Sequence, residues 1–81
     1  MDASPSIPLA RLPVGAHTRV ISVPPEDADR LAAEGLHRGD SLEVVAQLPL
    51  GGPVVARLGR ARVAIARTVA AGILVEAAGR P

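Results

Sequence analysis

Hydrophobic and polar residues alternate between positions 42 and 48, which predicts a β-strand with one buried face. The apolar side of this strand consists of Leu42, Val44, Ala46 and Leu48. An earlier stretch, from His17 to Val23, is also typical of a strand, and Pro24 and Pro25 end it because proline cannot donate a ladder hydrogen bond. The segments before and after residues 42–48 therefore supply its partner strands.

Residues 25–34 carry the end signals of one helix of about ten residues. Pro25 suits the first turn, and the acidic residues after it suit the positive amino end of a helix. We expect Gly35 to end the helix in the left-handed conformation, with Leu36 packing back onto it. The stripe expected to face inward consists of Ala28, Leu31 and Ala32.

Residues 54–65 predict a β-hairpin, because Gly59-Arg60 suits a two-residue turn with glycine at its first central position. The apolar pairs that this turn predicts are Leu58 with Ala61, Ala56 with Val63, and Val54 with Ile65. The same register places Arg57 opposite Arg62, and we expect Glu43 to offset this like-charge pair. A short helical turn over residues 67–70 and a last strand over residues 73–76 are expected to follow.

Five short strands and one helix in 81 residues predict a mainly β domain, a small SH3-like five-stranded barrel with the helix between its first and second strands. A five-stranded OB barrel is the alternative. We expect a flexible leader over residues 1–8, the barrel over residues 9–76 and a tail over residues 77–81. Because so small a core stabilises the fold only modestly, self-association is also expected.

Amino-acid composition narrows the classes of function. The chain has no cysteine, which excludes disulfides, thiolate nucleophiles and cysteine-ligated metals. It has no aromatic residue, which disfavours base stacking and the binding of proline-rich peptides. No histidine has a serine or cysteine arranged near it as a nucleophile, so we expect no catalysis and no cofactor. The sequence has neither a secretion signal nor a membrane-spanning run, so we expect a soluble cytoplasmic protein without membrane insertion.

Several turn and core motifs follow one another in a specific order: residues 9–15 (LARLPVG), 34–39 (EGLHRG), 49–53 (PLGGP), 63–67 (VAIAR) and 70–75 (AAGILV). Together they resemble the FeoA family, the small SH3-like partners of bacterial ferrous iron transport. The resemblance implies an accessory or regulatory module that docks on the GTPase domain of the ferrous iron transporter. Two positions depart from the family pattern, because Glu34 replaces a common leucine and Arg38 replaces a proline.

The same fold occurs in metal-dependent repressors of the diphtheria-toxin-repressor type, so a metal-sensing or regulatory module is an alternative. Its candidate ligands are Glu34, His37 and Asp40, because imidazole and carboxylate groups suit ferrous iron. We expect no metal site, since a site needs several convergent ligands and a solvated turn histidine explains His37 equally simply.

The turns and the hairpin also supply candidate partner-binding residues: Leu36, His37, Arg38, Leu50, Gly51, Arg57, Arg60 and Arg62. The leucines are either exposed contact residues or loop anchors that pack inward. The arginines either bind an acidic partner or are solvated charges that Glu43 and Glu76 neutralise. A third hypothesis, nucleic-acid binding by the hairpin arginines, is disfavoured because the patch is small and no groove-reading helix is predicted.

Overall fold

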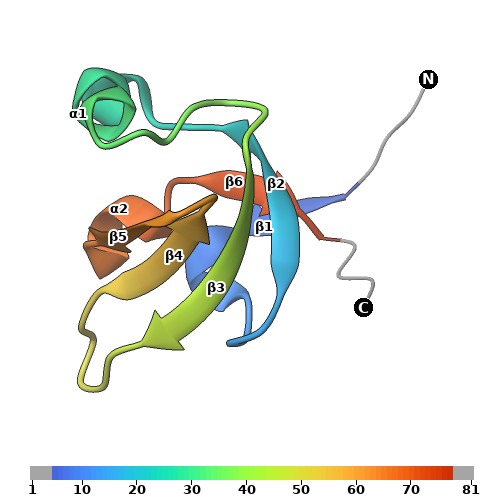
Figure 1. Ribbon diagram of the computed structural model, residues 1–81, viewed down its shortest axis with the longest axis vertical. Coiled ribbons are helices and arrows are strands. Elements are labelled where there is room, and N and C mark those ends of the chain that lie inside the picture. Colours follow the sequence, from blue (N-terminus) through green and yellow to red (C-terminus); the bar gives the residue numbers. More distant parts are fainter. Residues whose placement is uncertain (1–4, 78–81) are drawn as a thin grey trace.

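The computed structural model describes residues 5–77. Within this range the chain forms six strands and four short helical segments (Figure 1). The strands are β1 (Ser6–Pro8), β2 (His17–Ser22), β3 (Ser41–Gln47), β4 (Val54–Leu58), β5 (Ala61–Ile65) and β6 (Leu74–Glu76). The helical segments are η1 (Leu9–Arg11), η2 (Pro25–Asp27), α1 (Ala28–Ala33) and α2 (Arg67–Ala70).

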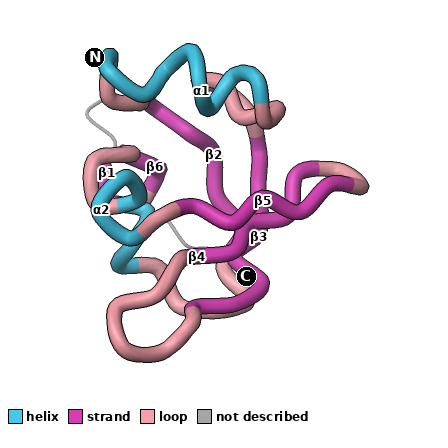
Figure 2. Tube along the Cα trace, turned by 90° about the vertical axis from the view of Figure 1, so that its left-hand side faces the viewer, coloured by secondary structure: helices cyan, strands magenta, loops and turns pink. Residues whose placement is uncertain are grey.

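The six strands form one antiparallel sheet in the order β1-β6-β2-β3-β4-β5. Strands β1 and β5 are its two edges, so among the described residues the sheet is open and has six strands, where we predicted a five-stranded barrel. The mainly β composition is confirmed. Helix α1 lies at one end of the molecule, beyond β5 on the side away from β4 (Figure 2).

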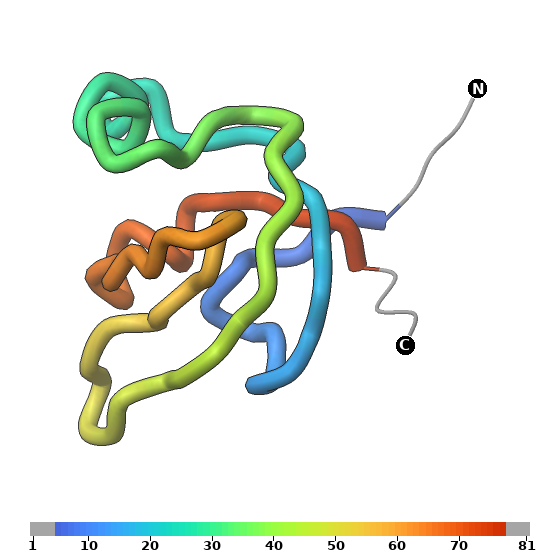
Figure 3. The backbone as a smooth tube through the Cα atoms, viewed as in Figure 1, coloured from blue at the N-terminus to red at the C-terminus, as the bar shows by residue number. Residues whose placement is uncertain are grey.

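The sixth strand comes from the segment predicted to be a flexible leader. Residues 6–8 pair with β6, with Ile7 opposite Val75, so the expected domain boundary at residue 9 is wrong for this part of the leader. The N–H of Ala77 donates to the carbonyl of Pro5 at 3.1 Å, which places the two ends of the described chain side by side (Figure 3). The prolines hid this strand from the sequence pattern, because proline is tolerated on a sheet edge but disfavours a strand elsewhere. Residues 1–4 and 78–81, also expected to be leader and tail, lie outside the described residues.

The core is built from aliphatic side chains alone, and no buried polar or charged residue is found within residues 5–77. The buried set is Leu9, Leu12, Val20, Leu31, Leu36, Leu42, Val44, Val54, Ala56, Val63, Ile65, Ala70, Ile73 and Val75. Within the described residues, no helix is long and apolar enough to cross a membrane.

The helix is shorter than predicted and buries fewer residues. A 3-10 turn over Pro25–Asp27 precedes the six residues of α1. Of the predicted inward stripe, Leu31 is buried, Ala28 is half-buried and Ala32 is exposed. Fewer than two turns of helix place few side chains on any one face, so a single leucine anchors α1 to the core.

The hairpin has the predicted register in full. Val54, Ala56 and Leu58 lie opposite Ile65, Val63 and Ala61, and Arg57 lies opposite Arg62. Gly59 has a φ of 60°, as a turn with glycine first requires. The alternation of β3 is less regular than predicted, because its pairing with β4 shifts between Val44 and Ala46. Leu48 was expected on the buried side, but this bulge ends the alternation and leaves Leu48 43% exposed.

Gly35 ends α1 with the predicted left-handed cap. Its φ is 95°, its N–H donates to the carbonyl of Ala32, and the N–H of Leu36 donates to the carbonyl of Leu31. These two bonds satisfy carbonyls that a helix end would otherwise leave without partners. The cap therefore fixes the direction in which the chain leaves α1.

Replacing Gly35 with alanine is expected to destabilise the fold by about 1–2 kcal/mol, because a β-carbon disfavours the left-handed conformation. A new Cβ at this position meets no atom within 4 Å, so steric crowding would not contribute. Urea unfolding measures the loss. Gly35→Asn is the matched control and should lose less, since asparagine tolerates this conformation; equal stability of the alanine variant and the wild type would contradict the assignment.

Candidate functional site

The turn after α1 does not present Leu36 to a partner. Leu36 is 1% exposed and belongs to the core, so its prediction as a partner-binding residue is wrong. The Gly35 cap reverses the chain and turns this side chain inward, the second of the two possibilities that the sequence left open. His37 and Arg38, the next two residues, are exposed.

Asp40 organises this turn through His37. A carboxylate oxygen, Oδ2, accepts the backbone N–H of His37 at 2.8 Å and lies 3.3 Å from the imidazole Nδ1. Glu34 does not join them, since no three histidine, cysteine, aspartate or glutamate side chains gather into a possible metal site within residues 5–77. The observed role of Asp40 is thus to cap a turn, as aspartate side chains commonly do.

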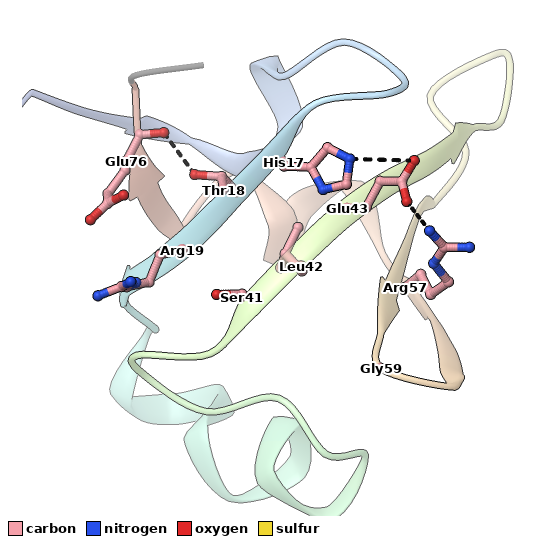
Figure 4. A pocket seen from close by; sticks show the side chains of 9 residues that line it. All are labelled: His17, Thr18, Arg19, Ser41, Leu42, Glu43, Arg57, Gly59 and Glu76. Atoms are coloured by element: carbon pink, nitrogen blue, oxygen red, sulfur yellow. Dashed lines mark hydrogen bonds and ion pairs between the residues drawn. The ribbon is translucent and has the colours of Figure 1, made fainter. Parts of the chain in front are cut away.

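A row of charged side chains crosses the outer face of the sheet at one level. The strand register places His17 opposite Glu43, Glu43 opposite Arg57, and Arg57 opposite Arg62. Glu43 forms an ion pair with Arg57, as predicted, and its other oxygen lies 4.0 Å from the Nε2 of His17 (Figure 4). Along this row the charge is therefore positive at His17 when the imidazole is protonated, negative at Glu43, and positive at both Arg57 and Arg62.

An open groove lies over this row. Its lining consists of His17, Thr18, Arg19, Ser41, Leu42, Glu43, Arg57, Gly59 and Glu76. The hydroxyl of Thr18 donates to the backbone carbonyl of Glu76 at 2.7 Å and ties β2 to the end of β6 (Figure 4). The carboxylate of Glu76 forms no ion pair with the hairpin arginines among the described residues. Of the predicted ion pairs between these arginines and Glu43 or Glu76, the described residues therefore contain the one between Arg57 and Glu43.

The β3–β4 loop exposes an apolar side chain completely. Leu50 has a relative exposure of 101% and a φ of 59°, a left-handed conformation that is costly for leucine. Gly51 beside it has a φ of 74°. Of the predicted partner-binding leucines, Leu50 is therefore the one that reaches solvent.

Arg67, the first residue of α2, holds this loop in shape. Its Nε donates to the carbonyl of Gly52 at 3.0 Å, and its two terminal nitrogens lie 3.4 Å from the carbonyl of Leu48 and 3.5 Å from Oε1 of Gln47. The amide nitrogen of Gln47 in turn donates to the carbonyl of Leu12. These bonds connect the start of α2, the end of β3 and the chain after η1, so the loop is ordered although its tip is exposed.

The sequence offered no signal for this role of Arg67. An arginine at the start of a helical turn has many possible partners, and its actual partners lie between 15 and 20 residues away in the chain. Two of the three are main-chain carbonyls, which every residue carries. The contact therefore depends on the folded path of the loop and not on a residue type.

Arg67→Ala is expected to destabilise the protein by about 1–2 kcal/mol, because it removes hydrogen bonds from a charged donor. It should also speed hydrogen exchange at the amides of Leu48 and Gly52, which donate within the loop. Arg62→Ala is the matched control: Arg62 is exposed, lies on the neighbouring hairpin and has no ion-pair partner among the described residues. If both variants exchange alike at these two amides, Arg67 does not hold the loop.

Glu43→Gln is expected to cost only about 0.2–1 kcal/mol, because the ion pair with Arg57 lies on the surface, with 47% of the Arg57 side chain exposed and Glu43 half-buried. The cost should shrink with added salt, which screens exposed charges. Urea unfolding at low and high ionic strength measures both effects. Glu34→Gln serves as the control, since Glu34 is exposed and forms no ion pair within residues 5–77; a salt-independent loss for Glu43→Gln would refute the electrostatic explanation.

Comparison with known proteins agrees with this architecture. The profile of the FeoA domain matches residues 7–77. Among curated protein sequences, none matches the chain. Similar solved structures include the FeoA protein of Chlorobium tepidum, which is 33% identical with a TM-score of 0.79 over 93% of this chain and 74% of that chain. The zinc complex of Stenotrophomonas maltophilia FeoA, described as a procaryotic SH3 domain protein, is 31% identical with a TM-score of 0.70 over 88% of this chain and 91% of that chain.

A manganese-dependent transcriptional repressor shares the fold alone. It is 20% identical, with a TM-score of 0.83 over 94% of this chain and 44% of the repressor chain. These neighbours confirm that the fold is SH3-like, as predicted. In this chain the fold consists of six strands in an open sheet. Because the family profile covers residues 7–77 of the 81, the chain belongs to the FeoA domain family.

Proposed function

We propose that this protein is an accessory factor of ferrous iron transport that docks, on the cytoplasmic side, on the GTPase domain of the transporter. Membership of the FeoA family supports the transport role, and one solved FeoA protein is described as an iron uptake regulatory protein. The proposed role is binding without catalysis. The Leu50 loop, residues 48–52, is the proposed docking element.

The observation that carries this proposal is the combination of exposure and order at Leu50. A fully exposed leucine gains about 1.5–3 kcal/mol when a partner buries it. Here it stands on a loop that Arg67 already holds, so little conformational entropy is lost when the partner binds. The left-handed backbone of Leu50 costs stability in the free protein, and such strain tends to be found at functional positions.

Leu50→Gly should separate stability from binding. Glycine adopts a positive φ without strain, so the variant is expected to be more stable by up to about 1 kcal/mol. The same change removes the proposed contact and should weaken binding to the cytoplasmic domain of the transporter at least about tenfold. Urea unfolding and calorimetric titration measure the two effects.

Val14→Gly is the control, because Val14 is 59% exposed but lies on a different turn, between η1 and β2. It should leave the affinity for the transporter domain unchanged. Two results would refute the proposal: wild-type protein that shows no binding at high micromolar concentration, or Leu50→Gly binding as tightly as wild type. Equal weakening by both variants would show that the loss of binding is not specific to the Leu50 loop and would contradict its assignment as the docking element.

A further inference from the structure

The two edges of the sheet differ in how well they are protected. β1 has three residues and ends in Pro8, and short strands with proline are a common protection against unwanted pairing. β5 has five residues, contains no proline, and pairs with β4 alone among the described strands. The β5 edge is therefore the one at which the backbone of another strand can add.

The hairpin register identifies the backbone groups that face outward from β5. In a two-residue hairpin, the pair that closes the turn exchanges hydrogen bonds, and bonded pairs then alternate with non-bonded ones. Leu58 and Ala61 close the turn, so Ala61, Val63 and Ile65 direct their N–H and C=O groups toward β4. Arg62 and Ala64 direct theirs away from the sheet, and both residues are exposed. Backbone groups that face outward from a strand recur at every second residue, so Arg62 and Ala64 have the spacing needed to pair with an added strand.

A groove runs along this free edge. One part, about 430 Å³, lies between α1 and the end of β5, and the next, about 420 Å³, lies beside Ala61–Ala64. The two parts share Glu34 and Ala64. At the end of β5 the groove is bounded by α1 and α2, whereas beside Ala61–Val63 its far side is formed by Glu34, the residue that follows α1. No hydrogen bond or ion pair joins α1 to β5 within residues 5–77. Figures 1 and 2 both place α1 beyond β5, opposite β4.

The charged row on the outer face indicates what the added strand should carry. Glu43 neutralises Arg57, but Arg62 at the end of the row has no ion-pair partner among the described residues. An acidic side chain directly opposite Arg62 on a new strand would continue the alternation of charge. The opposite face of that strand would lie on the side of Leu31 and Ile65, which line the groove and of which only 2% each is exposed.

We propose that β5 is a strand-addition site for an extended segment of another protein, in which acidic residues alternate with apolar ones. Main-chain hydrogen bonds to Arg62 and Ala64 supply the binding, and the acidic residue opposite Arg62 supplies selectivity. A second copy of this chain fits less well, because α1 bounds the groove and a copy would bring its own helix and hairpin to the same place. The site is independent of the Leu50 loop and of the identity of the transport partner.

A capped peptide that alternates valine with glutamate is the probe, titrated into the isotope-labelled full chain and followed by NMR. The amides of Arg62 and Ala64 should shift and exchange more slowly with solvent as the peptide binds. A valine-lysine peptide is the matched control and should bind more weakly. No binding of the valine-glutamate peptide at millimolar concentration would overturn the proposal.

Ala64→Pro tests the main-chain contact, because it removes an N–H at the free edge and leaves the bonds between β5 and β4 in place. It should weaken binding about tenfold, whereas Ala64→Thr, which keeps the N–H, should not. Equal affinities of these two variants would overturn strand addition.

Arg62→Glu provides a second test, which remains decisive if the proline variant fails to fold. It should reverse the preference, so that the valine-lysine peptide binds more tightly than the valine-glutamate peptide. An unchanged preference would refute the assigned charge pairing. Sedimentation showing a dimer that Ala64→Pro abolishes would assign the edge to a second copy instead.

Discussion

The pairing of β3 with both of its neighbours is the constraint on which the rest of the structure depends. Glu43 lies opposite His17 on one side and Arg57 on the other, so a single register decides which side chains share the outer face across three strands. The same register places Val44 in the core, where its N–H and C=O bond to the chain at Ala16 and Gly15. A slip of one residue would exchange the charged and apolar faces, which an aliphatic core of this size could not tolerate.

The bulge at the end of β3 explains why the next loop needs Arg67. Once the pairing shifts after Val44, the alternation can no longer bury Leu48, and the chain leaves the sheet without an apolar anchor. Arg67 replaces that anchor with hydrogen bonds to two loop carbonyls. The loop thereby combines an ordered backbone with an exposed tip, and this combination is what makes Leu50 available to a partner at low entropic cost.

Features set by local chemistry were predictable from the sequence, and features set by the folded path were not. The hairpin register follows from Gly59-Arg60, and the end of the helix follows from Gly35, because each depends on a few adjacent residues. Strand β1 and the contacts of Arg67 were missed, since β1 pairs with a segment almost seventy residues later and Arg67 bonds to main-chain carbonyls. Leu36 was correctly expected to pack back on the helix, yet it was also placed on the partner surface. The sequence alone could not decide whether Leu36 is buried or exposed to a partner, because these two interpretations differ only in where the rest of the chain lies.

The two proposed contact surfaces lie at different ends of the molecule and rest on different physics. The Leu50 loop offers apolar area on a backbone held by Arg67, whereas the edge of β5 offers main-chain groups beside α1. In Figure 1 the β3–β4 loop and α1 stand at opposite ends, with the hairpin between them. Strand β4 connects the two surfaces, since it begins at the Leu50 loop and pairs with β5 along its whole length. A partner on one surface would therefore leave the other accessible, and β4 would hold the two partners in a fixed relative orientation.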